Sequence, residues 1–167
     1  MKLEDDLIVL RPFAPDDVPA LTAALRDDPG VDRWTRIPSP YTEAHAASSF
    51  TKTEEKAFAI VGRESGELLG GIGARLHDEG IADIGYWVKA DARGRGVATR
   101  ALVLIARHAV EELEALRVQL TTVPLNVASQ RVAEKAGFRR EGILRSLHEI
   151  KGVRRDAVMF SLLPEDL

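Results

Sequence analysis

The chain has 167 residues, a length typical of one domain, and its 45% hydrophobic and 29% charged residues are the mixture of an ordinary globular protein. The absence of cysteine excludes disulfides, thiolate metal sites and a cysteine nucleophile. A net charge of -3 argues against general affinity for nucleic acid or anionic membranes. The N-terminal residues lack the basic region of a secretory signal, and no apolar run approaches the ~20 residues of a membrane span, so we expect a cytoplasmic protein.

The first half of the chain alternates predicted strands and helices. A strand ends at Pro12, and the acidic residues Asp16 and Asp17 supply the first turn of a helix. Prolines around Trp34 favour an irregular loop. The predicted elements are a strand at 7–12, a helix from 16 to 25, a loop at 31–41, a helix from 42, a strand hairpin at 57–61 and 68–73, and a strand at 81–89.

The second half contains the most regular pattern. Apolar residues recur at three- and four-residue spacing from Leu102 to Leu113, which predicts an amphipathic helix. Gly137 is a suitable C-cap for a later helix. The predicted elements are a helix from 99, a strand at 118–123, a helix at 129–136 and a closing pair of strands around Gly152. Without repeats or linkers, the chain is predicted to be one mixed α/β (α+β) domain over residues 1–167.

The turn that precedes the long helix has the composition of an anion-binding loop. It reads Asp91-Ala92-Arg93-Gly94-Arg95-Gly96-Val97-Ala98-Thr99. Its glycines allow backbone N–H groups to converge on a phosphate at the positive end of the helix dipole. Four basic residues and one acid between Lys89 and Arg100 give a local charge of +3. The spacing of the glycines matches neither a P-loop nor a dinucleotide-binding fingerprint. The alternative to a phosphate site is a solvated turn.

These residues resemble a known family. Arg93-x-x-Gly96-x-Ala98, which follows the predicted strand 81–89, is similar to the coenzyme A pyrophosphate motif of GNAT N-acetyltransferases, especially the branch that acetylates ribosomal-protein N-termini. Further motifs support the resemblance from about residue 7 to the end, at 126–129, 135–138, 141–142 and Asp156. It implies a mixed, mostly antiparallel sheet of about seven strands flanked by about four helices. It also implies acetyl-CoA as acyl donor, no metal, an amine acceptor such as a protein N-terminus, and is compatible with a homodimer.

The same resemblance assigns a coenzyme site. Backbone N–H groups of residues 94–98 would hold the pyrophosphate, and the N–H of Val88 would face the thioester oxygen. Asn126, the only asparagine, is also a typical helix N-cap. The candidate coenzyme-binding residues are Val88, Arg93, Gly94, Arg95, Gly96, Val97, Ala98, Thr99, Asn126 and Ser129.

Acyl transfer to an amine also needs a general acid and a base. Many relatives place a tyrosine seven residues after the asparagine, but this position is Ala133, so Ser129 is the candidate acid. His148 and Glu149 are adjacent on a predicted strand and must point to opposite faces. The candidate catalytic residues are Ser129, Asp83, His148 and Glu149.

Aromatic residues around the proline-rich loop are candidates for the acceptor pocket. Trp34 and Tyr41 flank this loop, whereas Trp87 is expected to fill the core. The basic run 151–155 predicts a hairpin tip that is solvated, with contact to an acidic substrate or to a coenzyme phosphate as the alternative. The leading hypothesis is an acyl-CoA-dependent N-acyltransferase that works by direct attack in a ternary complex. The alternatives are a catalytically silent acyl-CoA-binding regulatory module, or the same chemistry with another donor such as succinyl-CoA.

Overall fold

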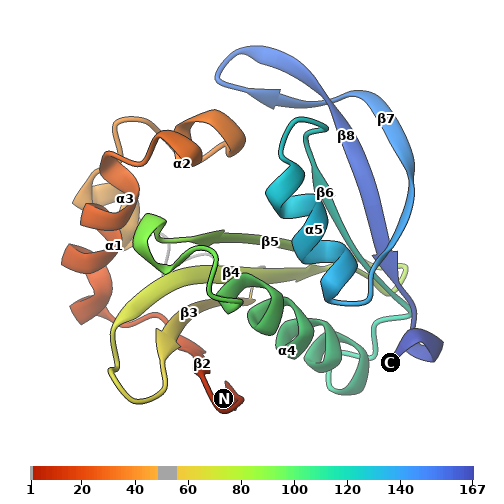
Figure 1. Ribbon diagram of the computed structural model, residues 1–167, viewed down its shortest axis with the longest axis horizontal. Coiled ribbons are helices and arrows are strands. Elements are labelled where there is room, and N and C mark those ends of the chain that lie inside the picture. The colour runs from red at the N-terminus through yellow and green to blue at the C-terminus, as the bar shows by residue number, and fades with distance from the viewer. Residues whose placement is uncertain (1, 49–55) are drawn as a thin grey trace.

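One sheet of eight strands runs through the molecule (Figure 1). The computed structural model describes residues 2–48 and 56–167. The strand order is β1-β2-β3-β4-β5-β6-β8-β7, and all neighbours are antiparallel except β5 and β6, which are parallel. The strands are β1 Leu3–Glu4, β2 Ile8–Pro12, β3 Lys56–Gly62, β4 Leu68–Leu76, β5 Ile81–Val88, β6 Arg117–Thr122, β7 Arg139–Ile150 and β8 Val153–Leu162.

Helices cover both faces of this sheet. The α-helices are α1 Val18–Arg26, α2 Pro29–Trp34, α3 Glu43–Ser48, α4 Val97–Glu111 and α5 Val127–Lys135, with short 3-10 turns at Pro15–Asp17, Ala90–Ala92 and Pro164–Asp166. Strand residues alternate between two cores: Ile8 and Leu10 pack with α4 and α5, whereas Val9 packs with α1, α2 and α3. No helix among the described residues is long and apolar enough to cross a membrane.

The prediction of the fold class is confirmed, and the element count needs a correction. The sheet has eight strands rather than about seven because of the two-residue strand β1, and five α-helices are described rather than about four. The additional helix is α2. It begins between the predicted helix at 16–25 and the predicted loop at 31–41, and it covers the start of that loop. Asp28 caps it by accepting a hydrogen bond from the N–H of Gly30 at 2.8 Å, and Pro29 fits its first position.

The sheet opens between β5 and β6. Their pairing runs only from Ile81 with Arg117 to Asp83 with Gln119, after which β6 remains paired with β8 alone. Just beyond β5, the N–H of Lys89 donates to a carbonyl of β4 at 2.8 Å. Because N–H groups of successive strand residues point to opposite edges, those of residues 84, 86 and 88 point towards the opening.

Candidate active site

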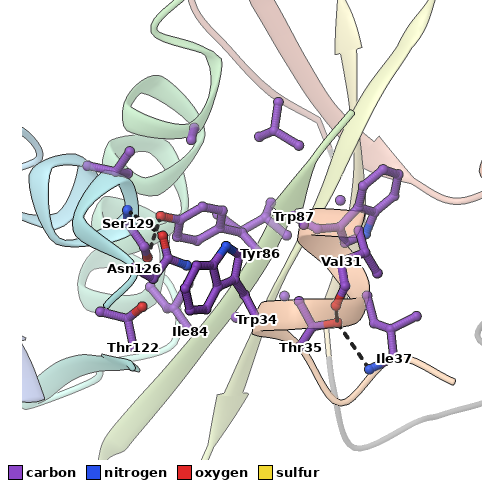
Figure 2. Close-up of a pocket in the computed structure, with 18 of the residues that line it drawn as sticks. Val31, Trp34, Thr35, Ile37, Ile84, Tyr86, Trp87, Thr122, Asn126 and Ser129 are labelled. Carbon is purple, nitrogen blue, oxygen red and sulfur yellow. Dashed lines mark hydrogen bonds between the residues drawn. The ribbon is translucent and has the colours of Figure 1, made fainter. Parts of the chain in front are cut away.

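A cavity of about 1020 Å³ occupies this opening (Figure 2). Its helix half is lined by β5, by the loop and first turn of α4 at 94 and 96–99, and by 126–135 of α5. Its loop half is lined by 34–38, which end α2 and follow it, and by His148 and Ile150 of β7. The cavity therefore joins regular elements on one side to irregular segments on the other.

The N-terminus of α4 is open at the helix half. Gly94 and Gly96 have φ values of 73° and 79°, a left-handed conformation that favours glycine, and no atom lies within 4 Å of where a Cβ would be. The first hydrogen bond of this helix runs from Arg100 N–H to the carbonyl of Gly96 at 3.0 Å, and no side chain caps it. The preceding N–H groups and the helix dipole are therefore available to an anion.

Most of the predicted local positive charge at this turn is neutralised in the folded protein. Acids that are distant in sequence pair with three of the four cations, and Arg95 does not line the cavity. Arg131 and Lys135 of α5 do line it and form no ion pair with a described residue. The pairs are Lys89–Glu67 at 2.6 Å, Arg100–Asp5 at 2.8 Å, and Arg93–Asp28. The cations that face the cavity near the helix terminus thus come partly from α5, which the sequence argument missed.

Arg93 connects the two halves of the cavity. Its Nε donates to the carbonyl of Val88 at 2.9 Å, and its guanidinium bonds to the carboxylate of Asp28. The Asp28 side chain is 4% exposed and caps α2 at the same time. Nε and Nη2 of Arg93 are therefore engaged in structural bonds, and the side chain still contributes to the cavity lining.

Asn126, Ser129 and Tyr86 form a chain of polar groups (Figure 2). The side-chain oxygen of Asn126 caps α5 through the N–H of Ser129 at 3.2 Å. The Ser129 hydroxyl lies 2.9 Å from the phenol oxygen of Tyr86, which β5 directs towards α5. Burial raises the pKa of Tyr86, and the bond with Ser129 opposes part of this rise. Sequence reasoning missed Tyr86, although its even-numbered position on β5 places it on the side of Val88.

His148 lines the cavity and Glu149 does not, as expected for neighbours on a strand. The Nε2 of His148 lies 2.7 Å from the hydroxyl of Thr121 on β6. Burial lowers the pKa of His148, and the positive charges of Arg36 and Arg154 lower it further. The imidazole therefore favours its neutral form. Glu149 is exposed.

Asp83, the other candidate base, lies outside the cavity lining. Both oxygens of its carboxylate are engaged, one 2.5 Å from Nε2 of His77 and the other accepting from the Gln119 amide at 2.7 Å. The physical reason is the register, because β5 is still paired with β6 at Asp83 and the opening begins one residue later. Its position does not suit the predicted role.

The three aromatic residues occupy different environments. Trp34 projects from α2 into the cavity (Figure 2). The Arg33 guanidinium lies 4.4 Å from the centre of its ring. Tyr41 also contributes to the lining, but it is only 5% exposed and belongs mainly to the core. Trp87 packs partly against that core, as predicted, and Gly71 makes room for its indole, since a Cβ there would lie 2.6 Å from Nε1.

The hairpin tip between β7 and β8 contacts the loop half instead of standing free in solvent. The amine of Lys151 bonds to the carbonyl of Ile37 and lies 3.7 Å from the carboxylate of Asp32 on α2. The prediction of a simply solvated turn was therefore wrong for Lys151. Among the residues that the structure describes, no group of three histidine, aspartate or glutamate side chains is arranged for a metal ion.

Residues 8–139 match the family model described as the acetyltransferase (GNAT) domain. The chain belongs to the GNAT acetyltransferase family. It is 35% identical over 118 residues to "Probable N-acetyltransferase YjcK" of Bacillus subtilis, a match that covers 69% of this chain and 65%, slightly under two thirds, of that relative. It is 28% identical over 149 residues to "Uncharacterized N-acetyltransferase p20" of Bacillus licheniformis, covering 83% of each.

Among solved structures, the chain is similar to Mycobacterium smegmatis RimJ in complex with CoA-disulfide. The two are 25% identical, with a TM-score of 0.86 over 100% of this chain and 88% of that one. The resemblance to GNAT enzymes of the RimJ type that the sequence motifs indicated is therefore confirmed.

Proposed function

We propose that this protein transfers an acetyl group from acetyl-CoA to a primary amine, with the coenzyme in the helix half of the cavity and the amine in the loop half. The observation that carries the proposal is the open edge of β5 beside the uncapped N-terminus of α4, both on one cavity. An extended pantetheine arm can pair with the strand edge while its pyrophosphate meets the helix N-terminus. The RimJ structure with a coenzyme A derivative supports this placement.

The backbone of residues 94–99 is proposed to bind the pyrophosphate, with Arg131 and Lys135 as neighbouring cations. The N–H of Val88 points to the opening and is the donor proposed to polarise the thioester carbonyl. Arg93 holds the carbonyl of this residue at 2.9 Å, so it orients Val88 rather than the phosphate. Arg95 is a candidate only for a phosphate that extends beyond the cavity rim.

Ser129 is the proposed general acid for the departing thiolate, and Tyr86 supports it. Their oxygens are 2.9 Å apart, so a proton given up by Ser129 can be replaced from the phenol. Because burial raises the pKa of Tyr86, the phenol stays protonated at neutral pH. Tyr86 thus supplies from β5 the phenol that many relatives supply from the position of Ala133.

His148 is the proposed general base, since it alone of the three candidates lines the cavity. In the tautomer that donates Nε2–H to Thr121, the other ring nitrogen keeps its lone pair for a proton of the amine. The amine nitrogen attacks the carbonyl carbon, the C–N bond forms and the C–S bond breaks. The sulfur takes its proton from Ser129, and His148 takes one from the amine. With no cysteine in the chain, a cysteinyl intermediate does not arise.

Calorimetry with acetyl-CoA and thiol release against a panel of amines and N-terminal peptides test this function. We expect binding in the micromolar range and turnover with at least one amine. Binding without turnover on any amine would favour the silent regulatory module instead. Absence of binding at millimolar acetyl-CoA would exclude the coenzyme site itself.

A further inference from the structure

The charged side chains that line the cavity are basic in the described part of the chain. In the part of the chain that the structure describes, no aspartate or glutamate lines it, whereas Arg36, Arg93, Arg131 and Lys135 do. A wholly cationic acceptor such as a polyamine therefore meets no carboxylate and is repelled. Arg131 and Lys135 are proposed to bind the pyrophosphate, and Arg93 is paired with Asp28. A negative charge on the rest of the substrate is therefore left to Arg36.

Arg36 is the cation of the loop half that is free to meet such a charge. It lines the cavity on the segment that follows α2 and forms no hydrogen bond or ion pair with a described residue. Arg36 and His148 line the same cavity, and the positive charge of Arg36 lowers the pKa of His148.

The other cations nearby are already engaged. Arg33 lies over the Trp34 ring, Lys151 bonds to the carbonyl of Ile37, and Arg154 donates to the carbonyl of Ser146 at 2.5 Å.

We propose that the loop half contains a carboxylate subsite whose cation is Arg36, and that it selects substrates with a carboxylate close to the reacting group. The subsite rests on the proposed function and narrows its substrate class. The carboxylate has two sources, an acceptor in which an acidic group neighbours the amine, or a dicarboxylic acyl donor such as succinyl-CoA. In either case Arg36 also disfavours the ammonium form of the amine and so favours the neutral nucleophile.

Two peptides that differ by one charge, Ser-Glu-Ala-amide and Ser-Gln-Ala-amide, and two donors, acetyl-CoA and succinyl-CoA, separate the sources. Thiol release is measured with the unmodified protein, with Arg36→Met and with Arg107→Met, an exposed arginine of α4 outside the cavity. For an acceptor carboxylate, we expect kcat/KM to be about tenfold higher for the glutamate peptide, and only Arg36→Met to remove this preference. For a donor carboxylate, the preference is for succinyl-CoA with either peptide, and Arg36→Met again removes it.

Carboxylate binding at the subsite can also be measured without turnover. The imidazole of His148 is titrated by NMR with the N-acetylated form of each peptide and with free succinate. A bound carboxylate opposes the charge of Arg36 and raises the pKa of His148, so the glutamate peptide or succinate should raise it and the glutamine peptide should not. The Arg36→Met variant should lose this response.

The subsite is overturned if no carboxylate probe changes the titration of His148 and Arg36→Met leaves all substrate preferences as they were. The proposed function fails separately, if acetyl-CoA does not bind or no amine is acylated. A titration that responds in a protein without turnover would retain the anion site and remove the enzymatic role.

Discussion

The two halves of the cavity differ in whether backbone groups or side chains face the ligand. The helix half presents mainly backbone: the β5 edge, the left-handed turn at Gly94 and Gly96, and the first N–H groups of α4. The loop half presents side chains, among them Trp34, Arg36 and His148, on a short helix, a loop and the last hairpin.

Backbone groups recognise an invariant part of a ligand through any sequence that keeps the geometry, whereas side chains on irregular segments determine which variable part fits. This difference suggests that the helix half serves a common donor and the loop half a particular acceptor. Variants in each half should therefore damage different steps.

Replacing Gly96 by valine should have the largest effect. Its φ of 79° strains any branched residue, and the new side chain fills the space proposed for the pyrophosphate. We expect coenzyme A affinity to fall by about a hundredfold or more in calorimetry. Gly66→Val is the matched control, with a φ of 67°, equally open surroundings and a place outside the cavity. Equal losses in both variants would mean that strain alone acts.

Ser129→Ala should leave coenzyme binding nearly unchanged and lower kcat by about a hundredfold, the usual contribution of a general acid. The N–H of this residue still bonds to Asn126, so the start of α5 should persist. Turnover and calorimetry on the same preparation check both parts. Unchanged kcat would remove the acid role.

Tyr86→Phe should have a smaller effect and lower kcat by about tenfold. Ser129 keeps its own hydroxyl proton in this variant and loses only the phenol that would replace that proton. The double variant with Ser129→Ala should be no slower than Ser129→Ala alone if the two hydroxyls act as one relay. Additive losses would show that Tyr86 acts independently.

Asp28→Asn tests whether the halves are separable. Asparagine retains the cap of α2, while Arg93 loses its charged partner. We expect both the coenzyme Kd and the acceptor KM to rise several-fold. The free energy of unfolding, measured by thermal unfolding, should fall by about 1–2 kcal/mol. Asp32→Asn on the same helix is the control, since Asp32 is exposed and its ion pair among the described residues is with Lys151, not with Arg93. A loss of stability with both constants unchanged would show that Arg93 is structural only.

The smallest expected effect is on pH dependence. Burial and the charges of Arg36 and Arg154 lower the pKa of His148, so the acid limb of kcat should have its midpoint below the ordinary value for histidine. Arg36→Met should move this midpoint upwards. The lowered folded pKa also means that the unfolded state binds the proton more readily, so the contribution of His148 to stability is lost as pH falls through that pKa. If the midpoint stays unchanged in Arg36→Met, the general base is a residue other than His148.

Features set by local spacing were predictable from the sequence, and contacts between distant segments were not. Glycines at fixed offsets before an amphipathic helix determine local backbone geometry, so the turn before α4 and the Asn126 cap followed from spacing. The partners of Arg93 and the position of Asp83 depend on residues far apart in the chain and on the register of β5 with β6. Tyr86 is significant only because α5 folds against it.

Strand edges with unpaired backbone groups invite pairing between protein molecules, and this sheet leaves one such edge open on β5. That edge faces inwards, towards β6, so it is reached through the cavity and not from the outside of the sheet. The two outer edges of the sheet differ from this one in being short or irregularly paired. β1 has only two residues, and the pairing of β7 with β8 is interrupted by register shifts near Gly142 and between Leu144 and His148. The protein thus keeps a ligand-accessible strand edge without the aggregation hazard that an exposed one would carry.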